Sequence, residues 1–263
     1  PQEVLAVGDV IYLQWLDNQW LLAQDPQTEA ALVSVDSHDG AIQAMVGGFD
    51  YFRSKFNRVT HGERQVGSNI KPFLYSTALE NGMTAASTIN DAPVVFHDKN
   101  LEDIWRPENY SGRFYGPTRL RNALAFSRNL VSVRLLQKIG INTAVDYIHR
   151  FGFPMEELNR HKDLSLSLGS VQFSPLTVVS AYATFSNTGY LIEPYIISEV
   201  RNFNGDILYK ATPKKACIEN QCVAEDEFNA PRVIEARNAY IMTTMMQDVI
   251  RIGSGKKAKE LER

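Results

Sequence analysis

Hydrophobic and polar residues alternate in short stretches toward both ends of the chain, and this period of two predicts β-strands. The pair Asp17-Asn18 separates two such stretches and residues 37–40 separate the next two, so two hairpins are expected. Asn204-Gly205 predicts a third hairpin turn. The expected strands are residues 10–13, 20–22, 30–35, 41–46, 190–200 and 207–209.

In the middle of the chain, apolar residues recur at helical spacing between start and stop signals. Thr118 and Ser174 are expected helix N-caps, and Pro175 suits the first helical position. Gly140 and Gly189 are expected to follow helix ends. The expected helices are residues 68–80, 118–126, 129–139, 142–151, 174–186 and 233–250, with a polar loop over 253–263. Strands around a helical middle predict the α+β fold class.

Ser68 and Lys71 lie three residues apart at the expected start of the first long helix. This spacing puts their Cβ atoms on one helix face, about 5–6 Å apart. A serine hydroxyl becomes a good nucleophile when a neighbour takes its proton, and a lysine does so when burial keeps its amine neutral. Pro72 is compatible with the helix only in or near its first turn. Taken alone, the pattern also fits a helix-capping serine and a surface lysine.

A second polar pattern, Ser127-Arg128-Asn129, lies 59 residues after Ser68, in the link between two expected helices. A tight link can project a hydroxyl and an amide into a cleft. The hydroxyl could relay a proton between Lys71 and a leaving amine, and the amide could orient the lysine and bind a peptide. Together the two patterns predict a serine acyl-transfer site.

Composition is that of an ordinary soluble domain, with 263 residues, 44% hydrophobic and 22% charged. The net charge of −3 gives no support for nucleic-acid binding. No apolar run approaches the roughly 18 residues of a membrane-spanning helix. The chain begins at Pro1 without a methionine, so we expect a piece of a longer protein, with any membrane anchor outside it.

Cysteine and histidine positions bear on redox compartment and metal binding. Cys217 and Cys222 could form a small disulfide loop, which would indicate an oxidising compartment, or remain free thiols. Their spacing, without nearby histidines, argues against a zinc site. The five histidines form no metal-binding motif. We therefore expect neither a metal nor a cofactor.

Several segments, in the same order along the chain, resemble the class A penicillin-binding proteins. The resemblance covers nearly all of residues 28–263 and is strongest around Ser68, in the segment Arg-Gln-Val-Gly-Ser-Asn-Ile-Lys-Pro-Phe. The other segments that carry it are residues 46–50, 55–58, 105–110, 127–129 and 166–170. The resemblance implies a transpeptidase fold like that of the serine β-lactamases, with a helical subdomain and an antiparallel sheet flanked by helices.

The resemblance also implies a D,D-transpeptidase that crosslinks peptidoglycan stem peptides. Ser68 would attack the penultimate D-Ala carbonyl of a D-Ala-D-Ala stem peptide, with Lys71 as its general base. Ser127 would pass a proton to the departing D-Ala, and Asn129 would hold both Lys71 and the donor peptide. An amine of a second stem peptide would then resolve the acyl-enzyme. β-Lactams would acylate the same serine.

Three aromatic residues are candidate substrate-binding residues. Trp105, Tyr110 and Tyr115 fall in a segment that could line the acceptor side of the site. Aromatic rings on loops often anchor ligands by stacking. Ordinary loop packing would explain the same residues.

The family's third motif, Lys-Thr-Gly on a strand beside the serine, is absent from the sequence. We expect residues 28–263 to be the N-terminal part of a transpeptidase domain, truncated before that strand, and residues 1–27 to end a small β-rich, OB-like inserted domain. A second fragment of the same protein would carry the missing strand. Without it, this chain is expected to be inactive and poorly stable.

The resemblance further implies features that lie outside the chain. The parent protein would also be a peptidoglycan glycosyltransferase acting on a lipid-linked precursor. It would work on the periplasmic side of the bacterial inner membrane, and an outer-membrane lipoprotein is a candidate activator.

Three alternatives share the serine and lysine chemistry. A β-lactamase needs a deacylating base, often a glutamate poised over a water, and no such segment is visible. A D,D-carboxypeptidase would transfer the acyl group to water. A non-catalytic β-lactam sensor would acylate without turning over. An amine-dependent crosslinked product distinguishes the transpeptidase from all three.

Overall fold

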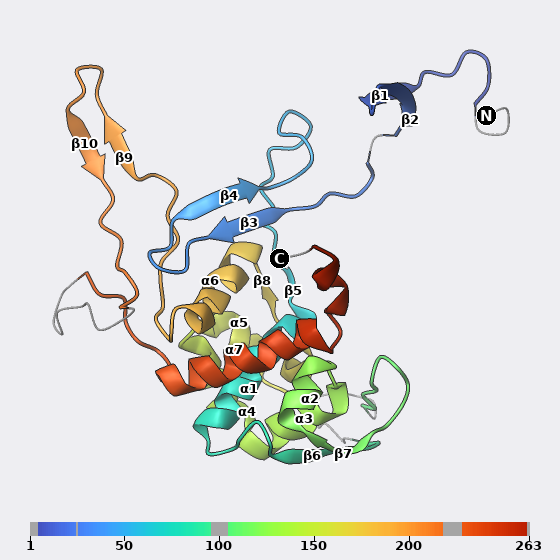
Figure 1. Ribbon diagram of the computed structural model, residues 1–263, viewed down its shortest axis with the longest axis vertical. Coiled ribbons are helices and arrows are strands. Elements are labelled where there is room, and N and C mark those ends of the chain that lie inside the picture. Colours follow the sequence, from blue (N-terminus) through green and yellow to red (C-terminus); the bar gives the residue numbers. More distant parts are fainter. Residues whose placement is uncertain (1–4, 25, 96–104, 218–227, 262–263) are drawn as a thin grey trace.

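The computed structural model describes residues 5–24, 26–95, 105–217 and 228–261. Its helices gather into one body, and the hairpins β1–β2, β3–β4 and β9–β10 lie above that body (Figure 1). The α-helices are α1 (Lys71–Glu80), α2 (Leu120–Ala125), α3 (Asn129–Ile139), α4 (Ile141–His149), α5 (Met155–Arg160), α6 (Pro175–Ser186) and α7 (Ala236–Arg251). Three 3₁₀ segments are η1 (Gly67–Ile70), η2 (Leu164–Leu168) and η3 (Lys256–Leu261).

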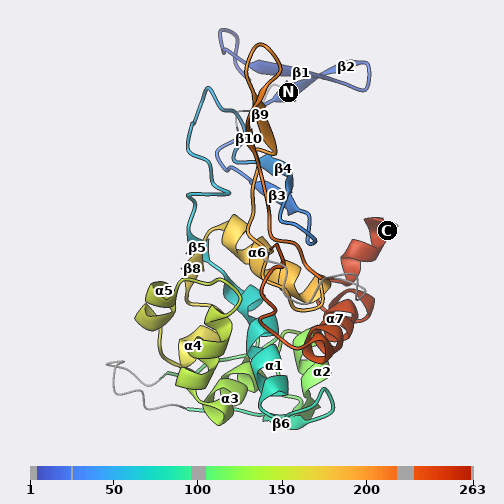
Figure 2. The same cartoon turned by 90° about the vertical axis from the view of Figure 1, so that its left-hand side faces the viewer.

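Helix α1 is the centre of the helical body, between α4 and α7 (Figure 2). Eight of its residues, 71–78, are buried, so the helix is enclosed on all sides instead of presenting one apolar stripe. The ring of Phe73 lies 4.9–5.2 Å from the four rings of Phe151, Phe153, Tyr182 and Phe185. Burying each large side chain contributes about 1.5–3 kcal/mol, which fixes the helix that carries Lys71.

The strands of the described residues pair as separate two-stranded antiparallel sheets. The pairs are β1 (Tyr12–Leu16) with β2 (Gln19–Ala23), β3 (Leu32–Val35) with β4 (Ile42–Val46), β5 (Arg64–Gln65) with β8 (Gln172–Phe173), β6 (Thr88–Asp91) with β7 (Gly116–Arg119), and β9 (Glu199–Arg201) with β10 (Ile207–Lys210). Asp17 and Asn18 have φ of 49° and 60°, as a tight hairpin turn requires. The predicted hairpins and the α+β class are confirmed.

The sequence predicted the positions of most helices, and the structure corrects several of their details. Thr118 is not a helix cap: it lies in β7, its hydroxyl donates to the carbonyl of Gly116 at 2.9 Å, and α2 begins two residues later. Pairing of β7 with β6 overrides the capping propensity of the threonine. The expected loop after residue 253 instead contains η3, and within 190–200 only the last two residues belong to a named strand.

The capping predicted at Ser174 is confirmed. Its hydroxyl accepts from the Thr177 N–H at 3.2 Å, and Pro175 occupies the first turn of α6. The structure adds the short helix α5 after Pro154 and the antiparallel pair of β6 with β7. Both are too short for a periodic pattern to reveal.

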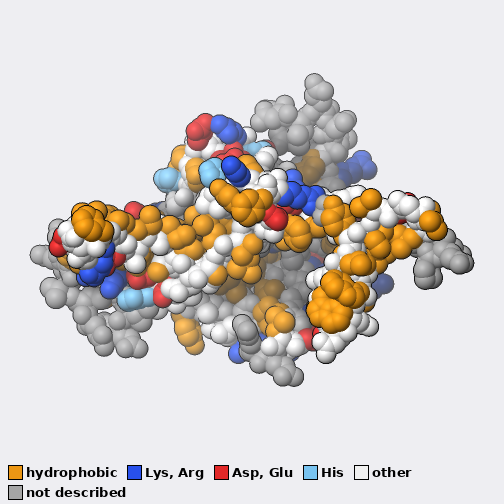
Figure 3. Space-filling view, turned by 90° about the horizontal axis from the view of Figure 1, so that it is seen from above, with side chains coloured by type: hydrophobic (Ala, Val, Ile, Leu, Met, Phe, Trp, Pro, Cys, Tyr) orange, Lys and Arg blue, Asp and Glu red, His pale blue; other side chains and the backbone are white. Residues whose placement is uncertain are grey.

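Hydrophobic side chains spread over the hairpins that lie above the helical body (Figure 3). Trp15 and Trp20 are more than half exposed, with ring centroids 5.0 Å apart. Cys217 is disulfide-bonded, while Cys222 lies outside the described residues. No helix within the described ranges is both long and apolar enough to cross a membrane.

Candidate active site

Ser68 sits in the 3₁₀ turn η1, just before α1. The Gly67 N–H donates to the Gly169 carbonyl at 3.1 Å, which ties this turn to the segment after η2. Gly169 has a φ of +78°, and a Cβ there would lie 2.0 Å from the Gly67 carbonyl oxygen. Only glycine permits this close approach. This contact holds residues 166–170, one of the segments that carry the family resemblance, against the turn that contains Ser68.

Lys71 is the first residue of α1 and is 1% exposed. Its Nζ donates to the Ser127 carbonyl at 2.9 Å, to Ser127 Oγ at 2.9 Å and to Asn129 Oδ1 at 2.7 Å. Burial lowers the pKa of Lys71 from its ordinary 10.5 to about 8, because desolvation disfavours the ammonium form. At pH 7 about one lysine in ten would then be neutral, against about one in three thousand at the ordinary pKa.

Ser127 lies in the turn between α2 and α3 and has a φ of 53°. This left-handed conformation is uncommon for a residue with a side chain. Its Oγ accepts from Lys71 and donates to Ser68 Oγ at 3.0 Å. Among the described residues no hydrogen bond joins Ser68 directly to Lys71. The two residues are therefore linked through the hydroxyl of Ser127, which is an arrangement suited to proton relay.

Asn129 begins α3 and is fixed from two sides. Its Oδ1 accepts from Lys71, and its Nδ2 donates to the Glu108 carbonyl at 2.8 Å. Because a carbonyl can only accept, it determines which end of the amide faces the lysine. The structure thus brings the predicted residues Ser68, Lys71, Ser127 and Asn129 into one connected group.

Two residues that the sequence analysis missed support Asn129. Asn109, 5% exposed, accepts from the backbone N–H groups of Asn129 at 2.9 Å and Leu130 at 3.4 Å, and so caps α3 from a distant segment. Its Nδ2 donates to the buried carboxylate of Asp91 at 2.7 Å and to the Arg113 carbonyl at 2.9 Å. No spacing rule signals this connection, because the three segments meet only in the folded chain.

Replacing Asn109 with alanine is expected to destabilise the protein by about 2–3 kcal/mol. The change removes the cap of α3 and leaves a buried oxygen of Asp91 without its donor. Urea unfolding measures the effect. Asn122→Ala, at an exposed position in α2, is the matched control and should change stability by less than about 0.5 kcal/mol. Equal effects of the two variants would contradict the capping role.

Two cavities flank Ser68. One, of about 250 Å³, extends toward α6 and α7 and is lined by residues that include Tyr182, Met246 and Ser254. The other, of about 390 Å³, extends past Ser127 toward Tyr110. The Tyr182 hydroxyl donates to the Asn69 carbonyl at 3.0 Å, and burial raises the pKa of this phenol above its usual range. Tyr182 therefore acts as a neutral donor that holds the serine turn.

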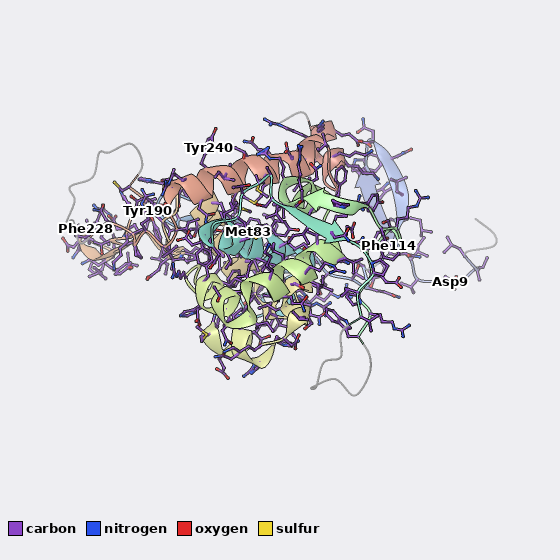
Figure 4. The ribbon with its side chains drawn as sticks, turned by 90° about the horizontal axis from the view of Figure 1, so that it is seen from below. Asp9, Met83, Phe114, Tyr190, Phe228 and Tyr240 are labelled. Atoms are coloured by element: carbon purple, nitrogen blue, oxygen red, sulfur yellow. The ribbon has the colours of Figure 1, made fainter. Side chains whose placement is uncertain are left out.

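The three predicted aromatic residues have different surroundings. Tyr110 lines the larger cavity and is fully exposed. Tyr115 carries the guanidinium of Arg128 over its ring, 3.3 Å from the centroid. Trp105 lines neither cavity beside Ser68. Phe114, next to Tyr115, lies on the side of the molecule away from Tyr190 and Phe228 (Figure 4).

Comparison with known proteins gives a consistent result. The family model described as the penicillin binding protein transpeptidase domain matches residues 30–262. Penicillin-binding protein 1A of Pseudomonas aeruginosa is 41% identical, over 100% of this chain and 36% of that protein. Penicillin-binding protein 1A of Escherichia coli is 43% identical, over 82% of this chain and 25% of that protein. The chain therefore spans between a quarter and about a third of the length of these relatives.

Solved structures agree with the sequence matches. The crystal structure of penicillin-binding protein 1A from Haemophilus influenzae has a TM-score of 0.89 and 37% identity, over 95% of this chain and 40% of that one. PonA1 from Mycobacterium tuberculosis, in complex with penicillin V, has a TM-score of 0.70 and 26% identity, over 86% of this chain and 57% of that one. With a family model over most of its length and relatives above 40% identity, the chain belongs to the penicillin-binding protein transpeptidase family.

Proposed function

We propose that the chain carries the acylation site of a D,D-transpeptidase that crosslinks peptidoglycan stem peptides and is acylated by β-lactams. The observation that carries the proposal is the connected series Ser68 Oγ, Ser127 Oγ and Lys71 Nζ, with a lysine whose pKa is lowered to about 8. Relatives named penicillin-binding protein 1A support the assignment. Ser68 is the nucleophile, and Lys71 is the base.

In the first half-reaction, Ser68 Oγ attacks the carbonyl carbon of the penultimate D-Ala. The serine proton passes to Ser127 Oγ, and the Ser127 proton passes to neutral Lys71. The carbon–nitrogen bond then breaks, and the proton on Lys71 returns through Ser127 Oγ to the departing D-Ala amine. The Ser68 backbone N–H supplies half of the oxyanion hole, a contribution of about 3–4 kcal/mol per donor in serine proteases.

In the second half-reaction, the amine of another stem peptide attacks the Ser68 ester. Its proton moves through Ser127 to Lys71, the new amide bond forms, and the ester carbon–oxygen bond breaks. The proton on Lys71 then returns through Ser127 to Ser68 Oγ, which restores the starting state of the site. Asn129 holds Lys71 through Oδ1 in both half-reactions.

The proposal extends to a longer parent protein. We infer that residues 28–263 form the N-terminal part of its transpeptidase domain and that residues 1–27 end a β-rich inserted domain. A Lys-Thr-Gly strand outside this sequence would supply the second oxyanion donor and the carboxylate-binding edge. The parent protein would add a glycosyltransferase domain and a membrane anchor, and would work on the periplasmic side of the inner membrane. An outer-membrane lipoprotein remains a candidate activator.

The proposed activity is tested by supplying the full-length protein with a D-Ala-D-Ala stem peptide and separating the products by mass. A transpeptidase forms a crosslinked dimer whose yield rises with the amine-bearing acceptor. Hydrolysed peptide without dimer would replace the proposal with a D,D-carboxypeptidase. A stable acyl-enzyme with neither product would indicate a β-lactam sensor.

A further inference from the structure

The cavity beside Ser127 has an unusual charge distribution. Its nine lining residues are Ser68, Asn109, Tyr110, Ser111, Phe126, Ser127, Arg128, Asn129 and Ser254. Arg128 is the only one with an ionised side chain, and the others offer hydroxyls, amides and aromatic rings. A cavity of about 390 Å³ with one cation and several neutral donors favours an anionic ligand group.

The Arg128 guanidinium is held in place by aromatic rings. It lies 3.3 Å from the centroid of the Tyr115 ring and 5.4 Å from that of Phe126. The Tyr115 hydroxyl donates to Ser111 Oγ at 3.3 Å, which anchors the ring. A guanidinium has five N–H donors, so one that stacks on a ring retains N–H groups that can meet a planar carboxylate in a two-bond contact.

No ion pair of the described residues involves Arg128, so no acidic side chain among them neutralises its positive charge. Hydrogen bonding to Ser111 and Arg128, and the positive charges of Arg128 and Arg113, lower the pKa of Tyr115. The positive charge of Arg128 therefore acts on the Tyr115 hydroxyl. A ligand carboxylate could approach Arg128 without displacing an acidic side chain.

We propose that Arg128, supported by Tyr115, forms a carboxylate-binding subsite for the peptide that supplies the attacking amine. This inference rests on the proposed transpeptidase function. The attacking amine must reach Ser127 Oγ, and Arg128 follows Ser127 in the chain and lines the same cavity. An acceptor whose amine is flanked by a carboxylate, as in an α-amino acid, could place both groups there. The donor peptide also carries carboxylates, so the test must separate the two sources.

The experiment uses the full-length protein, a thioester donor and two acceptors, D-alanine and D-alaninamide. The acceptors differ only in the carboxylate, and the ratio of their aminolysis rates measures the preference for it. Arg128→Gln is expected to reduce this ratio about tenfold relative to the wild type. The aminolysis rate of each acceptor is compared with its own rate in the wild type, so the different basicity of the two amines does not affect the comparison. A parallel arm exchanges a side-chain carboxylate on the donor for a carboxamide and measures acylation.

Variants and controls sharpen the result. Arg150→Gln is the matched control, because Arg150 also lies over a tyrosine ring, 5.1 Å from the centroid of Tyr147, at a helix end outside both cavities. It should leave the acceptor ratio within twofold of the wild type. Tyr115→Ala, at a half-exposed position, should lower the ratio in the same direction as Arg128→Gln, and it carries the test if Arg128→Gln does not fold.

Each outcome has a defined meaning. A reduced preference in the acceptor arm supports the subsite as proposed, and a reduced preference confined to the donor arm overturns its assignment to the attacking peptide. Unchanged ratios in both arms overturn the subsite while leaving the acyl-enzyme, and hence the proposed function, in place. A wild type that forms no acyl-enzyme with the thioester overturns both.

Discussion

Replacing Ser68 with alanine is expected to abolish covalent labelling of the full-length protein by a fluorescent penicillin. The Ser68 hydroxyl is the group to which Ser127 donates at 3.0 Å, and both cavities open onto it. The neighbouring Ser127 could not substitute, because its left-handed turn and its contact with Lys71 hold its Oγ as a relay. Intact mass spectrometry should show the full adduct on the wild type and none on Ser68→Ala.

The control for this experiment is Ser198→Ala. Ser198 is exposed and lies just before β9, far along the chain from the site, so its removal should leave the adduct unchanged. Persistent labelling of Ser68→Ala would show that another residue is the nucleophile. Loss of the adduct in Ser198→Ala would point to general instability instead of a specific role for Ser68.

Local patterns in the sequence were sufficient to predict the main helices and to select four residues that the structure brings together. Helix α3 was predicted with its observed bounds, because an apolar stripe ends at Gly140 and a polar link precedes Asn129. Ser68 and Lys71 were predicted as a pair because their spacing is local. The chemistry of a hydroxyl and an amide in a tight link suggested roles for Ser127 and Asn129, and the family resemblance added the substrate; these roles remain proposals.

Contacts between distant segments could not be predicted in this way. Sequence spacing suggested that Lys71 would act on Ser68 directly, while the structure connects them through Ser127. Likewise the cap of α3 comes from Asn109, 20 residues before the helix. The sequence contains the asparagine, but nothing local distinguishes it from any other loop amide.

The rate of acylation is expected to rise with pH through about 8, following the neutral form of Lys71. Burial lowers the pKa of Lys71 from 10.5 to about 8, so deprotonation occurs within an accessible range. Between pH 6 and pH 7 the neutral fraction rises about tenfold, and above pH 8 it levels off. Because the neutral amine is the active base, activity is lost as pH falls and not as it rises.

Lys71→Met tests this role with a side chain of similar length and no base. Acylation by penicillin is expected to fall by a factor on the order of 10²–10⁴, the usual contribution of a positioned general base. The residual rate should lose its rise through pH 8, because the group that titrates there is gone. Stopped-flow or mass-based acylation kinetics at several pH values measure both effects.

The matched control is Lys138→Met, at an exposed position in α3, which removes the same charge outside the site. It should preserve both the rate and the pH profile. The pH profile is the decisive measurement, because a purely structural role for Lys71 would lower the rate without removing the titration. If the acylation rate of Lys71→Met still rose through pH 8, the base would have to be another group. The hydrogen bonds from Lys71 would then serve only to position the side chains of Ser127 and Asn129.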